Sequence, residues 1–515
     1  MRLALPRVVI GGLGGGCGKT LVAVGAVRAL RERGLRVVPF KKGPDFIDAA
    51  WLSRAAGIPC RNLDSYLMGE PGVMATVAAH GGGVPLRRRP HGAPAGSEGP
   101  QPGGLAIVEG ARGLFDAMDE GGSTSTARLA KLLACPIVLV VDCTKVTRTV
   151  AAMVYGCQRL DRRLRIAGVI LNRVGNPRHE ANVRSAVTAV CGLPVLGALP
   201  RMAEAALPER HLGLVMPDEH DAAEDAIATI ARVVARHVDL DALAAIARTA
   251  ATLTAPAPPP AEPAERASGS RAVTVGVVRD NAFSFYYPEN LEALQACGAQ
   301  LVPVSATKDR ALPELDALYI GGGFPETNAG RLEANPGFAA SLRAAVEDGL
   351  PVYAECGGAV YVGRSLRVGE ATWPMAGILP LDFVLHERPQ GHGYSLLEAT
   401  EHNPFFPAGA RLRGHEFHYT AVAAWPAGGL PVGFRVQRGR GFDGAGDGVC
   451  HKSLMAVYSH VHAAGAPEWA VGIVRRAVAF SDARAARRAG SGRAAAPAGA
   501  GGTALLARNN ALEGA

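Results

Sequence analysis

Short apolar runs alternate with amphipathic segments through the first half of the chain. Helical spacing appears at residues 20–33 and 185–191. The apolar runs occupy residues 8–10, 37–40, 105–108, 137–141 and 167–171. Continuous apolar runs of this kind are typical of strands buried on both faces of a parallel sheet. The first half is therefore predicted to be a doubly wound α/β domain.

The second half repeats this pattern in a different form. A helix is predicted over residues 288–297, and residues 371–460 contain many turns and alternating positions, which favour mixed or antiparallel strands. Further strands are predicted at residues 273–278, 301–304, 317–320 and 351–354. A second α/β domain is therefore expected.

Three low-complexity segments divide the chain. Residues 81–104 are rich in Gly, Pro and Arg and are predicted to form a flexible insertion. Residues 251–270 are predicted to form a stiff Pro/Ala linker, and residues 481–515 a disordered Ala/Gly/Arg tail. These limits place one domain at residues 1–250 and the other at 271–480.

Composition and charge narrow the function classes. The chain has 515 residues and a net charge of +8, of which residues 81–104 and 481–515 carry +2 and +3. Without a basic face interleaved with aromatic residues, no nucleic-acid partner is expected. No apolar run reaches the roughly 18 residues that span a bilayer, and no signal peptide is recognised. The nine cysteines include no C-x-x-C pair, so we expect a cytoplasmic protein in a reducing compartment.

A glycine-rich loop at residues 12–20 follows the first predicted strand and opens a helix with Gly18, Lys19 and Thr20. This arrangement is typical of a loop that cradles the phosphates of ATP. Lys19 is expected to reach the β- and γ-phosphates, and the Thr20 hydroxyl to hold Mg²⁺. Gly12 and Gly16 complete the candidate loop, although the usual motif places its leading glycine at position 13, where this chain has leucine. A chance match is the alternative in a chain with 64 glycines, but the strand and helix around the loop weigh against it.

Two carboxylates follow predicted strands at the edge where this loop lies. Asp45 and Glu109 are candidate Mg²⁺ ligands, because ligands bind beyond the carboxyl ends of parallel strands and Mg²⁺ prefers oxygen donors. Lys41 is a candidate to stabilise a transferring phosphoryl group, and the alternative is a surface charge. Asp48 is interpreted as a solvated turn carboxylate.

A second reactive group, Cys356, follows the strand at 351–354 and precedes Gly357 and Gly358. A strand-to-helix turn with small neighbours exposes the sulfur as a nucleophile. The three glycines at 321–323 follow another strand and are a candidate oxyanion hole. The alternative is a buried structural cysteine.

His460 is the candidate general base for Cys356, and as an acid it would protonate the leaving amine. His462 competes with it, because both would point to one face of a strand spanning 456–462. The spacing favours a Cys–His dyad over a triad, and leaves open whether Glu416 or another acid orients the base.

Taken together, these motifs resemble the cobyrinate a,c-diamide synthase family, whose relatives also amidate sirohydrochlorin or its nickel complex. The resemblance spans roughly residues 7–475 and rests on residues 12–20, 40–48, 62–64, 108–110, 113–116, 171–174, 208–214, 282–288, 321–326, 354–358 and 414–419.

The resemblance implies a dethiobiotin-synthetase-like P-loop domain joined to a class I-like glutamine amidotransferase domain. It implies hydrolysis of glutamine at Cys356 through a thioester, and transfer of ammonia to a tetrapyrrole carboxylate that ATP and Mg²⁺ have activated as an acyl phosphate. It also implies that Asn172 contacts adenine. A homodimer is compatible with this interpretation.

One departure from the family concerns the acceptor. The family tends to have proline and histidine where this chain has Ala49 and Leu52, in a loop expected to face the tetrapyrrole. Sirohydrochlorin or sirohaem is therefore the alternative acceptor to cobyrinate. Two different functions also compete with this interpretation, namely those of a cobyric acid synthase and of a ParA/MinD-like switch ATPase. Switch ATPases usually have a second lysine early in the loop, where this chain has glycines.

Overall fold

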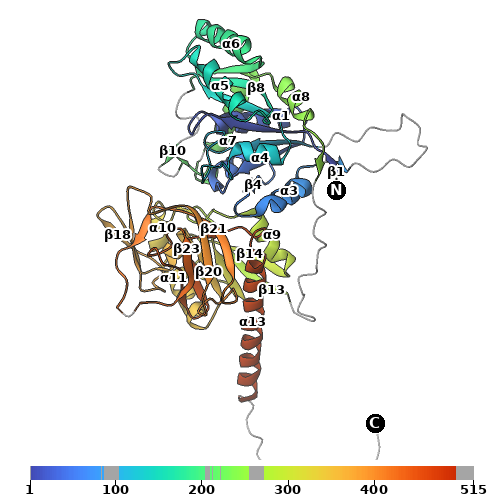
Figure 1. Ribbon diagram of the computed structural model, residues 1–515. Coiled ribbons are helices and arrows are strands. Elements are labelled where there is room, and N and C mark those ends of the chain that lie inside the picture. The colour runs from blue at the N-terminus through green and yellow to red at the C-terminus, as the bar shows by residue number, and fades with distance from the viewer. Residues whose placement is uncertain are drawn as a thin grey trace, which may run out of the picture.

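Two sheets, one in each half of the chain, organise the protein (Figure 1). A computed structural model describes residues 2–82, 84–85, 104–202, 209–210, 213–220, 222–254, 272–427 and 429–494. We call the parts around the first and second sheet the N-terminal and C-terminal domains.

The N-terminal sheet has seven parallel strands in the order β4-β3-β6-β2-β7-β8-β9. The five apolar runs expected to form strands all do so. The strands are β2 (Arg7–Gly12), β3 (Val37–Lys42), β4 (Arg61–Leu63), β6 (Leu105–Glu109), β7 (Ile137–Asp142), β8 (Ile166–Val174) and β9 (Val195–Pro200).

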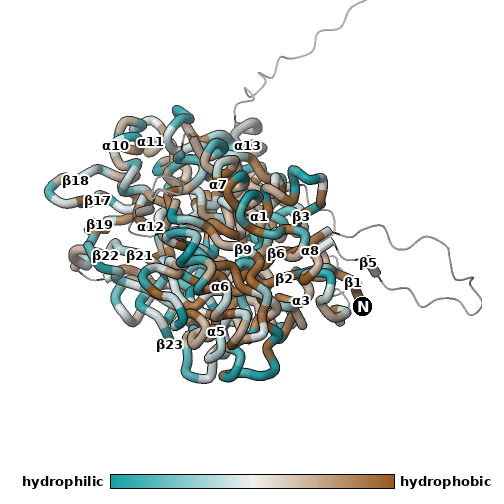
Figure 2. The backbone as a smooth tube through the Cα atoms, turned by 90° about the horizontal axis from the view of Figure 1, so that it is seen from above, coloured by the Kyte–Doolittle hydropathy of each residue, from teal (hydrophilic) through white to brown (hydrophobic). Residues whose placement is uncertain are grey.

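Helices cover both faces of this sheet, so its central strands are buried on either side (Figure 2). One layer packs α1 (Lys19–Glu32), α2 (Phe46–Ala56), α7 (Ala223–His237) and α8 (Leu240–Arg248). The other packs α3 (Gly69–His80), α4 (Thr126–Leu132), α5 (Thr149–Leu160) and α6 (Pro177–Cys191). The expected doubly wound α/β class is therefore confirmed. Short elements near the end of this domain are β10 (Glu209–Arg210), β11 (Gly213–Leu214) and η2 (Pro217–Glu219).

The first two low-complexity segments are shorter than expected. β1 (Arg2–Ala4) pairs with both β5 (Val84–Pro85) and β12 (Leu253–Thr254) in a small antiparallel sheet. The ends of the expected insertion at 81–104 and linker at 251–270 therefore contribute strands, because backbone pairing does not need an apolar sequence. The rest of both segments, 86–103 and 255–270, lies outside the described residues.

The C-terminal sheet is mixed, as the sequence predicts, with ten strands in the order β14-β13-β15-β16-β25-β24-β23-β20-β21-β26. The first five are parallel and the others antiparallel. The strands are β13 (Val273–Val278), β14 (Ala299–Val304), β15 (Ala317–Ile320), β16 (Val352–Glu355), β20 (Gly391–Ala399), β21 (Arg411–His418), β23 (Val432–Arg438), β24 (Gly446–His451), β25 (Leu454–Val457) and β26 (His460–Val461). A four-stranded sheet beside it contains β17 (Ser365–Val368), β18 (Ala371–Pro374), β19 (Asp382–Leu385) and β22 (Thr420–Val422).

The helices of the C-terminal domain include one that corrects the expected tail. They are α9 (Pro288–Ala296), α10 (Ala329–Glu333), α11 (Pro336–Glu347), α12 (Gly357–Val362) and α13 (Glu468–Ala494). The tail expected from residue 481 is helical through residue 494, since Ala and Arg are good helix formers. Arg484 anchors this helix to Asp316 over 2.6 Å and Arg487 contacts Asp348 over 3.3 Å. Residues 495–515 lie outside the described residues.

The two domains dock through β4 and the residue that follows it. Arg61 pairs with Glu289 and Glu292 at the start of α9, over 3.2 and 2.6 Å. Tyr394 of β20 donates a hydrogen bond to Asp64 over 2.6 Å. These contacts set the carboxyl ends of the N-terminal strands against the C-terminal domain, with the two domains stacked one above the other in Figure 1.

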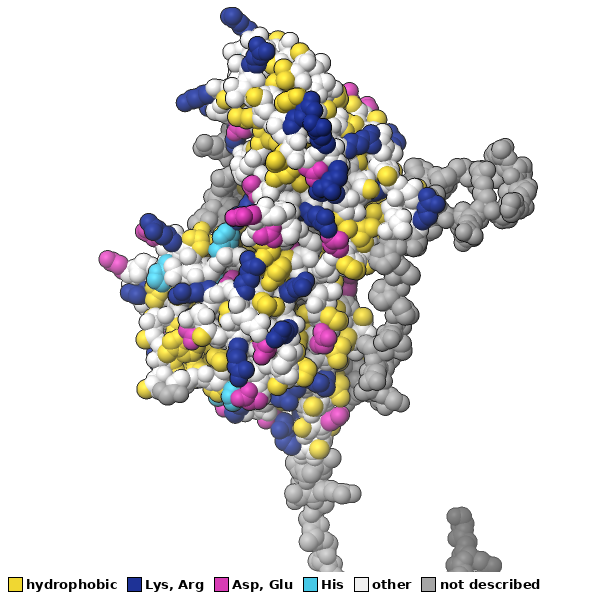
Figure 3. Space-filling model, in the orientation of Figure 1, with side chains coloured by type: hydrophobic (Ala, Val, Ile, Leu, Met, Phe, Trp, Pro, Cys, Tyr) yellow, Lys and Arg dark blue, Asp and Glu magenta, His cyan; other side chains and the backbone are white. Residues whose placement is uncertain are grey.

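The surface in Figure 3 shows Lys and Arg scattered among Asp and Glu rather than gathered in one patch. Among the described helices, none combines the length and apolar character needed to cross a membrane.

Arg7 generates a prediction about stability. Its side chain is fully buried at the start of β2 and donates to the carbonyl oxygens of Leu5, Leu133 and Ala251 over 2.7–2.8 Å. Arg7→Met removes these donors, and we expect the free energy of unfolding to fall by roughly 2–4 kcal/mol. Urea denaturation measures this. Arg128→Met, which breaks an exposed pair with Glu70, is the control and should change stability by less than about 1 kcal/mol. Equal effects of the two substitutions would contradict the prediction.

Candidate active sites

The phosphate loop needs glycine at position 12. A Cβ atom there would collide with the Cys17 sulfur and lie 2.9 Å from Lys19 Cδ. Gly18, the residue before α1, has a φ of +96°, and a Cβ there would collide with the Asn172 amide. Both positions therefore exclude side chains, which explains why the leading glycine stands at 12 although the usual motif would place it at 13.

Lys19 folds back over this loop, and its ammonium donates to the Gly14 carbonyl over 2.8 Å. Asn172, near the end of β8, is 5% exposed and donates to the Cys17 carbonyl over 2.9 Å. Asn172 thus supports the loop from the neighbouring strand. Its contact with adenine stays a prediction.

Lys41 lies at the centre of three carboxylates. Its ammonium is 2.5 Å from Asp48, 3.1 Å from Glu109 and 3.9 Å from Asp45. Lys41 is 2% exposed, so the interpretation as a surface charge is wrong. The interpretation of Asp48 as a solvated turn carboxylate is also wrong, because Asp48 is paired and only 18% of its side chain is exposed.

Burial and mutual repulsion give these three carboxylates different pKa values. Burial raises the pKa of Glu109 to about 7, against the lowering effect of Lys41. Burial and the neighbouring Asp48 raise the pKa of Asp45 to about 6. Burial would also raise the pKa of Asp48, but the attraction of Lys41 and its hydrogen bond bring it below the usual value. Asp48 is therefore the carboxylate most firmly ionised beside Lys41.

The oxygen atoms around Thr20 fit a magnesium ion. The Thr20 hydroxyl donates to Glu109 Oε1 over 2.6 Å, and the buried Glu109 Oε2 has no hydrogen-bond partner among the described residues. Asp45 fits less directly, since one of its oxygens caps α2 by accepting from the backbone N–H groups of Ile47 and Asp48. The described residues hold no group of three or more His, Cys, Asp or Glu side chains that would cage a metal alone. Mg²⁺ commonly completes its shell with phosphate oxygens and water.

Cys356 occupies a strained turn between β16 and α12. Its φ of +48° and ψ of −100° are unusual for a residue with a side chain. The turn is held by the Cys356 N–H, which donates to the Val457 carbonyl over 2.7 Å. A Cβ at Gly357 would lie 3.0 Å from the Gly323 nitrogen, and one at Gly358 would lie 2.6 Å from the Ile320 carbonyl. The glycine pair therefore lets the turn approach the expected oxyanion loop closely.

The structure brings together Cys356, His460 and a residue that the sequence interpretation missed. The His460 imidazole lies beside Cys356, which contributes to raising its pKa, and its Nδ1 lies 3.2 Å from Glu355 Oε2. Tyr319 donates to the same carboxylate oxygen over 2.9 Å. The expectation of a dyad is thus wrong in geometry, because Glu355 orients the imidazole. A charged residue ending an apolar strand, directly before the candidate nucleophile, was the available signal.

The two competing residues have other partners. The chain turns between β25 and β26, where Asp447 accepts from the N–H groups of Tyr458 and Ser459. Because β26 then ends at Val461, residues 456–462 do not form the one continuous strand that would put His460 and His462 on one face. His462 lies 3.6 Å from Glu289. Glu416 accepts from the backbone N–H of Gly441 over 2.9 Å and also from that of Arg440. Of the two histidines, His460 is therefore the one that contacts Glu355, and its role as the base stays a prediction.

The contacts of His460 with Glu355 and Cys356 determine whether its imidazole is protonated. Burial lowers its pKa, but the hydrogen bonds to Cys356 and Glu355 outweigh burial and raise it to about 10. The imidazole therefore carries its second proton at neutral pH and can protonate a leaving amine.

A cavity of about 650 Å³ between the domains reaches from the glycine-rich loop at 12–20 to His460. Lys19, Thr20 and Glu109 line it in the N-terminal domain, and His415 and His460 line it in the C-terminal domain. The glycine-rich loop and His460 thus open into the same space.

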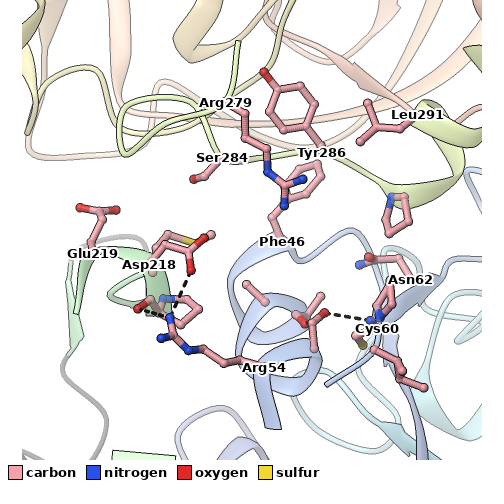
Figure 4. Close-up of a pocket in the computed structure, with 18 of the residues that line it drawn as sticks. Phe46, Arg54, Cys60, Asn62, Asp218, Glu219, Arg279, Ser284, Tyr286 and Leu291 are labelled. Atoms are coloured by element: carbon pink, nitrogen blue, oxygen red, sulfur yellow. Dashed lines mark hydrogen bonds and ion pairs between the residues drawn. The ribbon is translucent and has the colours of Figure 1, made fainter. Parts of the chain in front are cut away.

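The positions that depart from the family do not line this cavity. Leu52 is fully buried in the core beneath α2. Ala49 lines a second cavity between the domains, of about 790 Å³ (Figure 4). The segment expected to be a loop is instead the helix α2, whose inner face packs on the domain core, and the place of the acceptor stays a prediction.

Comparison with known proteins gives two family matches. Residues 8–215 match the CobQ/CobB/MinD/ParA nucleotide binding domain. Residues 274–468 match the CobB/CobQ-like glutamine amidotransferase domain. The phosphate loop and Lys41 lie in the first match, and Glu355, Cys356 and His460 in the second.

Curated relatives extend over nearly the whole chain. A cobyrinate a,c-diamide synthase of Magnetococcus marinus is 42% identical, with 92% of this chain and 98% of the relative covered. Proteins of the same name from Archaeoglobus fulgidus and Methanothermobacter thermautotrophicus are each 38% identical. The comparison covers 89% and 92% of this chain, and 94% and 100% of these relatives.

Glu355 generates a prediction on pH dependence. Its hydrogen bond is one cause of the raised pKa of His460, so Glu355→Gln should lower that pKa. Glutamine hydrolysis that needs protonated His460 should then decline at a lower pH than in the wild type, and kcat should fall roughly tenfold or more. The pH profile of kcat/KM for glutamate release measures both effects. Glu398→Gln, a surface carboxylate of the same domain that pairs with Arg411, is the control. An unchanged alkaline limb would show that Glu355 does not position the base.

Proposed function

The chain belongs to the family of cobyrinate a,c-diamide synthases, and from this premise we propose the reaction that it catalyses. It uses ATP and glutamine to convert the a and c acetate carboxylates of a tetrapyrrole such as cobyrinate into amides, as part of cobalamin biosynthesis. The observation that carries this proposal is the shared cavity, which reaches from the phosphate loop to His460.

The C-terminal half of the reaction releases ammonia. The Cys356 thiolate, whose proton His460 has taken up, attacks the side-chain amide carbon of glutamine, and His460 then donates this proton to the departing ammonia. Water then cleaves the thioester, which yields glutamate and restores the thiol. The close approach of Gly357 to the Gly323 N–H supports a role for the 321–323 loop in stabilising the oxyanion. Glu355 acts as a positioning residue for His460.

The N-terminal half activates the acceptor. A carboxylate is a poor electrophile, and transfer of the γ-phosphoryl group of ATP converts it into an acyl phosphate with release of ADP. Ammonia attacks the acyl carbon, phosphate leaves with the bonding electrons, and a proton is lost to give the amide. Lys19 binds the phosphates, and the Lys41 ammonium faces the same cavity, where its charge stabilises the transferring group.

Magnesium would bind at Thr20 and Glu109, with Asp45 as a further candidate. When bound, it would neutralise charge on the β- and γ-phosphates. The unpartnered Glu109 Oε2 supports this assignment.

The rim of the cavity suits an acceptor with several carboxylates. Lys42, Arg112 and Arg438 line it from both domains, and Arg112 lies 3.1 Å from His392. These groups complement anionic side chains around a macrocycle. Sirohydrochlorin and sirohaem remain alternative acceptors, because they present the same kind of acid to the same residues.

Substitutions that inactivate one centre at a time test whether one domain releases ammonia and the other activates the acceptor. Cys356→Ser should lower glutamine-dependent amidation roughly 10³-fold or more while ammonia-dependent amidation persists. Lys19→Ala should abolish both, because neither route works without phosphoryl transfer. Product formation with glutamine or ammonium chloride measures these outcomes, with Cys297→Ser and the exposed Lys308→Ala as controls. Continued glutamine use by Cys356→Ser would show that another group is the nucleophile.

Product mass decides the acceptor. Cobyrinate, sirohydrochlorin and sirohaem are each incubated with protein, ATP, Mg²⁺ and glutamine, and we expect two acid-to-amide conversions on cobyrinate. Four conversions would indicate a cobyric acid synthase. Consumption of ATP with every acceptor unchanged in mass, and no glutamate released, would favour a switch ATPase.

A further inference from the structure

Two cavities lie between the domains, and Phe46 borders both. The first, of about 650 Å³, holds the phosphate loop and His460. The second, of about 790 Å³, is lined by Arg54, Asp218 and Arg279 among others. Within the described residues, Phe46 is the one side chain common to the two linings.

The Phe46 ring crosses from the N-terminal domain into the glutamine-side centre. It stacks on Phe285 at a centroid distance of 5.0 Å and an interplanar angle of 5°, and lies 4.4 Å from the Tyr287 ring. Its centroid is 5.2 Å from that of His460 and 5.8 Å from that of His415. In Figure 4, Phe46 rises from α2 toward the segment that carries Ser284 and Tyr286.

The backbone that carries this ring belongs to the nucleotide side. Phe46 is the first residue of α2, directly after the capping residue Asp45. Asp48, in the same turn, is held by Lys41. One short segment thus has its carboxylates in the phosphate centre and its aromatic ring against the base of the other centre.

We propose that Phe46 is a seal that keeps ammonia in the cavity where the acceptor is activated. This inference rests on the proposed function. Because His460 lines the smaller cavity, ammonia that leaves Cys356 past His460 enters the space that contains Lys19 and Thr20. The Phe46 ring is the partition that separates this space from the larger cavity, which is one route by which ammonia would be lost.

Phe46→Ala should open the partition in both directions. Ammonia that escapes through the larger cavity forms no amide, because an opened site loses its reactive intermediate to water. The ratio of glutamate released to amide formed should therefore rise by about threefold or more. External ammonia should also enter through the opened partition, which should lower the KM for ammonium chloride, while kcat with ammonia stays close to that of the wild type. Phe46→Leu, which keeps most of the apolar bulk, should give a glutamate-to-amide ratio between that of the wild type and that of Phe46→Ala. Glutamate, ADP and amide are counted in the same reaction.

Control variants separate sealing from a loss of folding. Ile58→Ala truncates an exposed apolar residue that lines the larger cavity without contacting His460, and it should leave the ratio unchanged. Retained ammonia-dependent amidation in Phe46→Ala shows that the protein is folded and that its phosphate centre works. A wild-type ratio together with a wild-type KM for ammonia in that variant would overturn the seal. If the wild type itself forms no amide from either nitrogen source, the proposed function fails instead.

Discussion

A buried ammonium group fixes the relation between the two centres. Lys41 is almost fully enclosed, and a charge in such a place is tolerated only with partners, which here are Asp48, Glu109 and the more distant Asp45. Glu109 is thereby held beside Thr20, and Asp48 holds the first turn of α2. Because Phe46 belongs to this turn, the same charge cluster also sets the position of the ring that contacts His460.

The phosphate loop and the turn at Cys356 both depend on glycines, because other backbone or side-chain atoms lie against them at short distance. At Gly12 and Gly18 the loop lies against Lys19 and Asn172, and at Gly358 the thiol turn lies against the carbonyl of Ile320. A methyl group at any of these positions would displace the reactive residue beside it. The requirement is local, so a glycine next to a lysine or a cysteine at a strand end is already informative in the sequence.

Local signals account for what could be predicted. The apolar runs predicted β2, β3, β6, β7 and β8 of the first sheet and β13, β14, β15 and β16 of the second to within a few residues, but not β4, β9 or the individual strands after residue 371. The loop at 12–20 and the turn at Cys356 were identified by their neighbours. The contact of Glu355 with His460 joins segments far apart in the chain, and the pairing of Asp48 with Lys41 and the burial of Leu52 depend on how α2 packs on the sheet. Spacing does not contain that information. The predicted start of the disordered tail was wrong for a related reason. Arg484 anchors α13 through Asp316, which lies 168 residues away in the chain.

Joining the two centres through one cavity has a chemical basis. Ammonia that reaches neutral water takes up a proton and loses the lone pair that attacks an acyl phosphate. A nucleophile released at His460 keeps that lone pair only if the space around it excludes bulk water. The aromatic side chains of Phe46 and Phe285 line the cavity beside His460, whereas Lys19 and Thr20 line its other end. Apolar side chains therefore stand next to the histidine that would protonate the departing ammonia.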